Sequence, residues 1–140
     1  MNLNFYGTKG MLNFRFSIEK QLNNFNVYEY DIQAFITGIP AMPGATMQPG
    51  KGLDLNKDAK FIVSATLDEL LQLRALCLKE IKQCSIVRED KSLQFSLISD
   101  NKNEGEFVII VNAASSKTGA KFSLPIKLIP FRYKFVNILD

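Results

Sequence analysis

The stretch that decides the fold runs from residue 60 to residue 83, KFIVSATLDELLQLRALCLKEIKQ. It begins with a short apolar run, Phe61–Val63, of residue types that pack well on a pleated surface and indicate a buried strand. Thr66 then stands three residues before Glu69, which is the spacing of a capping box at a helix N-terminus. Leucines recur at helical spacing after this box. The stretch therefore predicts a strand followed by a helix over residues 66–82.

Segments with strand patterns lie on both sides of this helix. Before it, residues 2–6 and 12–19 alternate apolar and polar side chains around a glycine-containing turn, and residues 27–37 form a third alternating run. Pro125 lacks an N–H group, so the run that contains it favours an edge strand or a bulge. We expect an α+β fold, mostly antiparallel sheet, and an OB-like β-barrel with one helix is the alternative. The strands expected after the helix are 85–88, 93–99, 107–112 and 122–128. Alternation predicts that Leu93, Phe95 and Leu97 face inward. In the last strand it predicts that Phe122, Leu124, Ile126 and Leu128 point to the core, with Lys121, Ser123, Pro125 and Lys127 on the other face.

The last segment fits two structures. Phe131 and Phe135 have helical spacing and Pro130 suits a first helical turn, yet residues 131–135 also alternate as a strand would. We expect a helix over residues 130–139. In that case the single domain, residues 1–140, divides into two halves of strands closed by a helix, 1–83 and 84–140.

Residues 38–56 interrupt the regular patterns. They contain three prolines and four glycines, together with Met42 and Met47. This composition predicts a flexible loop, and a loop of this length in a compact domain is often functional.

Composition bounds the class of protein. The chain of 140 residues is 46% apolar and 22% charged, as is typical of a soluble globular domain. Its apolar runs are shorter than the roughly 20 residues that cross a bilayer, so no membrane association is expected. No secretory signal begins the sequence, and Cys77 and Cys84 are the two cysteines, which favours a reducing compartment without a disulfide. We expect the cytoplasm, or the host cytoplasm for a phage-encoded protein.

The residues that usually carry catalysis are scarce. The chain has no histidine, neither cysteine has neighbours that would make a zinc site, and no glycine motif that cradles phosphates follows a strand. Glu29 and Asp31 share a strand face, but paired surface acids are common. We therefore expect no catalytic residue, no metal, no cofactor and no enzymatic activity.

Charge is distributed unevenly. Residues 1–106 carry 12 basic and 13 acidic groups, while residues 107–140 carry five basic groups against Asp140 alone. A basic block on strand-forming segments indicates either an anion-binding face or a solvated face without a partner.

Single-stranded nucleic acid is the ligand that makes most use of these residues. Cations follow its phosphates, and bases stack on aromatic rings at about 1–3 kcal/mol per base. Rings and cations interleave in residues 14–16 and 131–135. In half-buried strands the phenylalanines face the core, so tyrosines are the better stacking candidates. The nucleic-acid-binding residues predicted are Tyr6, Lys9, Arg15, Tyr28, Tyr30, Lys117, Lys121, Lys127, Arg132 and Lys134.

Three short segments resemble a known family. Residues 6–12, YGTKGML, are similar to the lysine-glycine strand start of the Whirly proteins, without its second lysine. Residues 65–71, ATLDELL, and 124–129, LPIKLI, look like that family's two strand-to-helix junctions. With its two halves of strands closed by a helix, the chain resembles the Whirly, positive-cofactor-4-like and PUR-type proteins. The resemblance implies single-stranded nucleic-acid binding and homo-oligomers formed through the helices.

A second resemblance competes with the first. Residues 114–124, ASSKTGAKFSL, look like the closing hairpin of small phage single-strand-binding proteins of the OB type. Both resemblances imply the same ligand. We expect a non-catalytic protein that binds single-stranded DNA or RNA with little sequence preference, in replication, recombination or strand protection. The alternative is a structural or assembly module, such as a virion component, that binds no nucleic acid.

Overall fold

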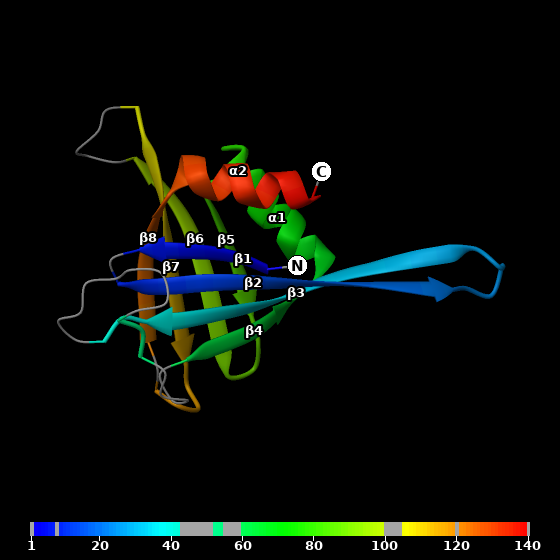
Figure 1. The fold of residues 1–140 in the computed structure, drawn as a ribbon, viewed down its shortest axis with the longest axis horizontal. Helices are drawn as coiled ribbons and strands as arrows, with labels where there is room; N and C mark the ends of the chain where they lie inside the picture. The colour runs from blue at the N-terminus through cyan, green and yellow to red at the C-terminus, as the bar shows by residue number, and fades with distance from the viewer. Residues whose placement is uncertain are drawn as a thin grey trace.

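The structure is a computed structural model that describes residues 2–7, 9–42, 52–54, 60–99, 105–119 and 121–139. It contains two four-stranded antiparallel sheets, each followed by one helix (Figure 1). Sheet 1 consists of β1 (Asn2–Gly7), β2 (Gly10–Leu22), β3 (Tyr28–Pro40) and β4 (Phe61–Ala65), and α1 (Leu67–Cys77) follows it. Sheet 2 consists of β5 (Gln83–Val87), β6 (Lys91–Ser99), β7 (Phe107–Ser115) and β8 (Lys121–Lys127), and α2 (Leu128–Leu139) follows it.

The expected α+β class is confirmed. In both sheets the strands lie in sequence order, and among the described strands no pairing joins one sheet to the other. Neither sheet closes on itself, so the OB-like barrel is wrong. β8 lies at the edge of sheet 2, as Pro125 predicted.

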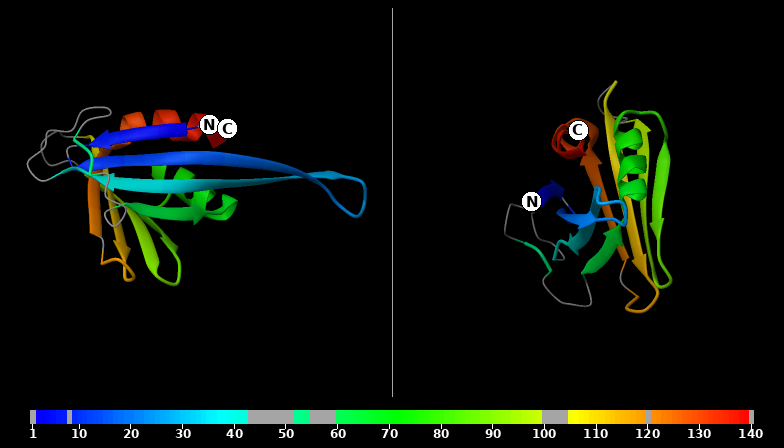
Figure 2. Two further views of the ribbon diagram at one scale, coloured as in Figure 1. Left: turned by 60° about the horizontal axis from the view of Figure 1, so that its bottom comes forward. Right: turned by 90° about the vertical axis from the view of Figure 1, so that its right-hand side faces the viewer.

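One hydrophobic core joins the two halves. The strands of sheet 1 run across those of sheet 2, and α2 lies beside β1 (Figures 1 and 2). Side chains from both sheets and both helices belong to one buried cluster. At its centre the rings of Phe5 and Phe14, from sheet 1, pack on those of Phe131 and Phe135, from α2, with centroids 4.4 to 6.0 Å apart. The last helix therefore covers the first two strands.

Helix α1 begins where the capping box predicted and ends before residue 82. Thr66 and Glu69 exchange both hydrogen bonds of the box. At the other end Lys79 adopts a left-handed conformation, with φ of 62°. Its N–H group donates to the Leu76 carbonyl and that of Glu80 donates to the Ala75 carbonyl, which is the Schellman pattern that closes a helix. The apolar spacing beyond residue 77 could not reveal this stop, because glycine normally occupies the position of Lys79.

The C-terminal segment is a helix, as expected, and begins two residues early, at Leu128. Phe131 and Phe135 are fully buried, whereas Tyr133 between them is 73% exposed. A strand would place all three on one face, so the strand alternative is wrong. Pro130 lies in the first turn, where its missing N–H group would have no helical partner.

The first residues of the loop expected over residues 38–56 lie in a strand. Gly38–Pro40 belong to β3, and Ala41 forms an isolated bridge with Leu53. A Cβ atom at Gly38 would lie 3.3 Å from the Phe122 ring, so this glycine permits a close approach of the two sheets and does not mark a turn. Residues 43–51 and 55–59 lie outside the described residues, as do Thr8, in the segment 6–12, and Ala120, in the segment 114–124.

Strands β2 and β3 continue past the body as a two-stranded hairpin, residues 17–33, which we call the arm (Figure 1). β1 pairs with β2 only as far as Arg15, and β4 pairs with β3 only from Ala34. Apolar and polar side chains alternate along β2 as expected, but the apolar ones are not buried over its whole length. Leu12 and Phe14 are buried in the body, whereas Ile18, in the arm, is 65% exposed.

Both cysteines are free thiols. Burial raises the pKa of Cys77 to about 12 and that of Cys84 to about 11, so both are protonated at neutral pH. Neither α1 nor α2 is long and apolar enough to cross a membrane.

An ion pair ties the second half of the chain to the start of α1. Arg88, in the β5–β6 turn, donates a hydrogen bond of 3.0 Å to one carboxylate oxygen of Glu69 and a shorter one to the other. It also donates to the Ser64 carbonyl at 2.6 Å. The hydrogen bond from Arg88, more than any other contact, holds the pKa of Glu69 below its usual value, against the opposing effect of burial.

Replacing Glu69 by glutamine should lower the free energy of unfolding by about 1–2 kcal/mol at pH 7, because glutamine can still complete the capping box but cannot pair with Arg88. Since the pKa of Glu69 is lowered by folding, its contribution exists above the unfolded pKa and is lost as pH falls through the folded pKa. Urea unfolding at pH 7 and pH 3 measures this. The difference from wild type should shrink at pH 3, whereas Asp68→Asn, in the same helical turn, should show no comparable effect. An equal difference at both pH values would contradict the prediction.

Candidate nucleic-acid interface

The face of sheet 2 that points away from the core carries no carboxylate within its four strands. Alternation turns the most buried residues of β6, β7 and β8 inward. Serine, glutamine and asparagine side chains point outward, together with a smaller number of apolar ones. The charged residues of this face are Lys121 and Lys127, which are exposed near the two ends of edge strand β8. Six residues of strand place their backbones about 20 Å apart. The outward side chains are Gln83, Ser85, Val87, Ser92, Gln94, Ser96, Ile98, Val108, Ile110, Asn112, Ala114, Lys121, Ser123, Pro125 and Lys127.

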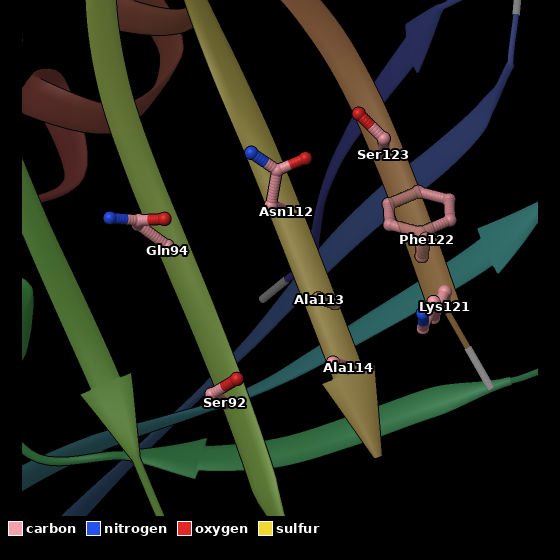
Figure 3. Close-up of a pocket in the computed structure, with 8 residues that line it drawn as sticks. All are labelled: Ser92, Gln94, Asn112, Ala113, Ala114, Lys121, Phe122 and Ser123. Atoms are coloured by element: carbon pink, nitrogen blue, oxygen red, sulfur yellow. The ribbon is translucent and has the colours of Figure 1, made fainter. Parts of the chain in front are cut away.

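A pocket of about 450 Å³ lies on this face, beside Lys121 (Figure 3). Gln94, Asn112 and Ser123, which are direct partners on three neighbouring strands, line it together with Ser92. The Gln94 and Asn112 amides each offer both hydrogen-bond donors and acceptors, so the row can form hydrogen bonds with many polar groups of a ligand, while Lys121 attracts an anion. Sequence reasoning missed these residues, although the alternation of residues 93–97 predicted which side chains of β6 face outward.

The turn between β1 and β2 lies against β8. A Cβ atom at Gly7 would lie 2.5 Å from the Leu124 side chain and 3.0 Å from the Pro125 carbonyl oxygen, so the glycine allows this contact. Lys9, in the same turn, is exposed, and Tyr6 at the end of β1 is 38% exposed. The structure therefore brings the turn that contains Lys9 next to the strand that carries Lys121 and Lys127, whereas Tyr6 lies on the outer face of sheet 1, together with Arg15.

A second group of lysines lies at the end of sheet 2 where β8 begins. Lys60, Lys91 and Lys117 line a pocket of about 470 Å³ together with Asp90. Lys91 donates a hydrogen bond of 2.9 Å to the Ile62 carbonyl, which links β6 to β4. The pairing of Ser92 with Ala114, and of Ala114 with Lys121, places this group one residue row from Lys121. Sequence reasoning missed Lys60 and Lys91, because they come from segments that only the tertiary fold brings together.

Three predicted cations lie elsewhere. Arg15 points away from the core on sheet 1, with its guanidinium 5.1 Å from the centroid of the Phe35 ring. Arg132 lines a groove between α1 and α2. Lys134 donates to the Asn4 carbonyl at 3.3 Å. The basic block of the last 34 residues is thus divided between sheet 2 and α2.

Tyr28 and Tyr30 are exposed, by 57% and 61%, but they lie in the arm. The register places them on the face of sheet 1 opposite to Tyr6 and Arg15. Lys20 lies over the Tyr28 ring at 4.0 Å, and the arm as a whole carries three carboxylates against this one lysine. The structure therefore does not bring these two tyrosines together with the lysines of sheet 2.

Comparisons with known proteins place the fold. No protein-family model matches the chain, and no match is found among curated proteins. Among solved structures the chain is similar to WHY1 from Arabidopsis thaliana, with a TM-score of 0.64 and 14% identity over 99% of this chain and 82% of that one. It is also similar to WHY3 from Arabidopsis thaliana, with a TM-score of 0.62 and 11% identity over 99% of this chain and 86% of that one. The expected resemblance to the Whirly proteins is thus confirmed at the level of the fold.

Proposed function

We propose that this protein binds single-stranded DNA or RNA with little sequence preference and without catalysing a reaction. The observation that carries the proposal is the outer face of sheet 2, which presents a row of amide and hydroxyl side chains, has no carboxylate within its strands and is bordered by the lysines of β8. The Whirly-like fold supports the proposal, because the resemblance to that family implies the same ligand.

In this proposal the lysines hold the phosphates and the sheet receives the bases. The sugar-phosphate backbone of the nucleic acid follows β8 from Lys127 to Lys121, with Lys9 beside it. It then continues to Lys60, Lys91 and Lys117 at the end of sheet 2. Bases meet the row of Gln94, Asn112 and Ser123, whose donors and acceptors suit any base edge. A nucleic-acid strand that continues past Lys9 reaches Tyr6 on the outer face of sheet 1, where bases stack on the exposed ring. Contacts of this kind read the backbone and the π-faces of the bases, which accounts for a low sequence preference.

The wider role in this proposal is replication, recombination or strand protection in the cytoplasm, within a phage or plasmid system, by a homo-oligomer. Supporting a non-enzymatic role, the chain has no histidine and both of its thiols are protonated at neutral pH.

Binding to a labelled oligothymidylate, measured by fluorescence anisotropy over a series of salt concentrations, tests the proposal. If the six lysines Lys9, Lys60, Lys91, Lys117, Lys121 and Lys127 each hold one phosphate, log K should fall with log salt at a slope of about −4. That slope corresponds to a loss of affinity of about 300-fold between 50 and 200 mM salt. An oligouridylate should bind similarly, because backbone contacts dominate. Undetectable binding, or binding that does not respond to salt, would remove the proposal.

A second candidate function is an assembly module that binds no nucleic acid. The exposed apolar side chains of the arm favour it, because contiguous exposed apolar surface often marks a protein interface. Light scattering after size exclusion, with and without oligonucleotide, separates the two functions. An oligomer whose molar mass is the same with and without oligonucleotide indicates the assembly module.

A further inference from the structure

The arm is an unusual element for an isolated chain. Between residues 17–22 and 28–33 it has two strands and, among the described residues, no third strand on either side. A two-stranded hairpin is at best marginally stable in water by itself. It leads away from the body in Figure 1 and in the left view of Figure 2. A surface that packs against the arm would therefore stabilise it.

The arm exposes much of its apolar surface. These side chains are between 56% and 85% exposed, and they cover one face and the tip of the hairpin. Contiguous apolar surface of this kind marks an interaction site more often than scattered exposed residues do. The residues are Ile18, Leu22, Phe25, Val27, Tyr28 and Tyr30.

The opposite face of the arm is acidic. Glu19 and Asp31 are direct cross-strand partners, an arrangement in which like charges repel, and Glu29 lies on the same face. The arm contains one lysine against three carboxylates, a net charge of −2. The rest of the chain has 16 basic and 11 acidic residues, a net charge of +5. A surface that suits the arm would combine apolar side chains with cations.

A groove between α1 and α2 has this combination. Its volume is about 520 Å³, and its lining contains two arginines and no carboxylate. Ile129 and Tyr133, on its α2 wall, are 72% and 73% exposed. The lining residues are Arg74, Leu78, Ile129, Arg132, Tyr133, Val136 and Asn137.

We propose that the arm of one copy lies in the α1–α2 groove of a second copy. The apolar face and tip of the arm pack on Ile129 and Tyr133, and its acidic face meets Arg132. The arm points away from its own helices, so the partner groove belongs to another chain. Reciprocal exchange of two arms gives a closed twofold dimer, the commonest form of homo-oligomer.

Shortening the arm tests the proposal. Phe16 and Ala34 are direct partners, so replacing residues 17–33 by Asn-Gly closes the hairpin with a two-residue turn and leaves the register of the body unchanged. Light scattering over a range of protein concentrations should show a dimer or a larger oligomer for the full chain and a monomer for the shortened one. Circular dichroism establishes that the shortened chain is folded. A full chain that is monomeric throughout, or an oligomer that survives the shortening, overturns the proposal.

Exchanging charges tests the groove itself. Asp31→Lys removes the repulsion with Glu19, so it should not weaken the arm, but it places a cation against Arg132 of the other copy. This variant and Arg132→Glu should each weaken association about tenfold, and the double variant should recover most of the loss. A double variant no better than the single ones overturns the groove as the docking site.

Apolar substitutions and oligonucleotide complete the test. Phe25→Ser should weaken association, whereas Val87→Ser, an exposed apolar residue on sheet 2, should not. If instead the full chain is monomeric and the shortened one loses oligonucleotide binding, the arm is a nucleic-acid contact and the proposal fails. The proposed nucleic-acid binding is unaffected by the other outcomes, because its lysines lie outside the arm.

Discussion

Replacing Lys9, Lys121 and Lys127 together by glutamine should weaken the binding of a single-stranded oligonucleotide on the order of 500-fold at 50 mM salt. Each lysine that leaves a phosphate removes about 0.7 from the salt slope, so three should reduce the slope by about 2 if affinity at 1 M salt is unchanged. The three side chains are exposed, on β8 and on the turn that packs against it, so the fold should not change. Anisotropy titrations at several salt concentrations give both quantities.

A matched variant separates position from net charge. Replacing Lys20, Lys79 and Lys82 by glutamine lowers the net charge by the same amount, but these lysines lie on the arm and after α1. This variant should keep most of the affinity and most of the salt slope. Equal losses in the two variants would mean that overall charge, and not the edge of sheet 2, holds the ligand.

Gly10→Ala should destabilise the fold by about 3–5 kcal/mol, because it combines backbone strain with overpacking. Gly10 has φ of 153°, and a Cβ atom there would lie 2.4 Å from the Ile39 carbonyl oxygen and 2.7 Å from the Phe122 ring. The backbone oxygen cannot move aside without disturbing the pairing of β2 with β3. Urea unfolding measures the loss.

Gly119→Ala is the control for the backbone alone. Gly119 also has positive φ, 72°, but nothing lies within 4 Å of its Cβ position, so about 1–2 kcal/mol is expected. If the two variants lose the same stability, the close approach of β2 to β8 is not what fixes glycine at position 10. Gly10 follows Lys9 in the lysine-glycine segment that resembles the Whirly proteins, so its glycine acts in packing and its lysine in the proposed binding.

Local signals in the sequence predicted elements well. The capping box of Thr66 and Glu69 located the start of α1, and period-two alternation identified the buried side chains of β8. Both signals depend on neighbours within a few residues, which a sequence displays directly. The end of α1 was missed because a lysine takes the left-handed position, and Gly38 was read as a turn because its partner, Phe122, is 84 residues away.

The candidate site was only partly predictable. Alternation indicated that Lys121 and Lys127 point outward, but Lys60 and Lys91 join them through the packing of β4 on sheet 2. The tyrosines of the arm, which were predicted as binding residues, lie apart from the lysines of sheet 2. Their residue type suits stacking. Their position depends on which strands pair with β2 and β3, and on which face of sheet 1 they share, and these pairings join segments that are distant in sequence.

The ring cluster at the centre of the core has a consequence for synthesis. Phe5 and Phe14 are covered by Phe131 and Phe135 of α2, which the ribosome makes only after all eight strands of the two sheets. Until α2 is made, β1 and β2 expose apolar side chains to solvent, and contacts between residues this distant in sequence form slowly. The nascent chain should consequently stay protease-sensitive and in need of chaperone protection until its final helix leaves the exit tunnel.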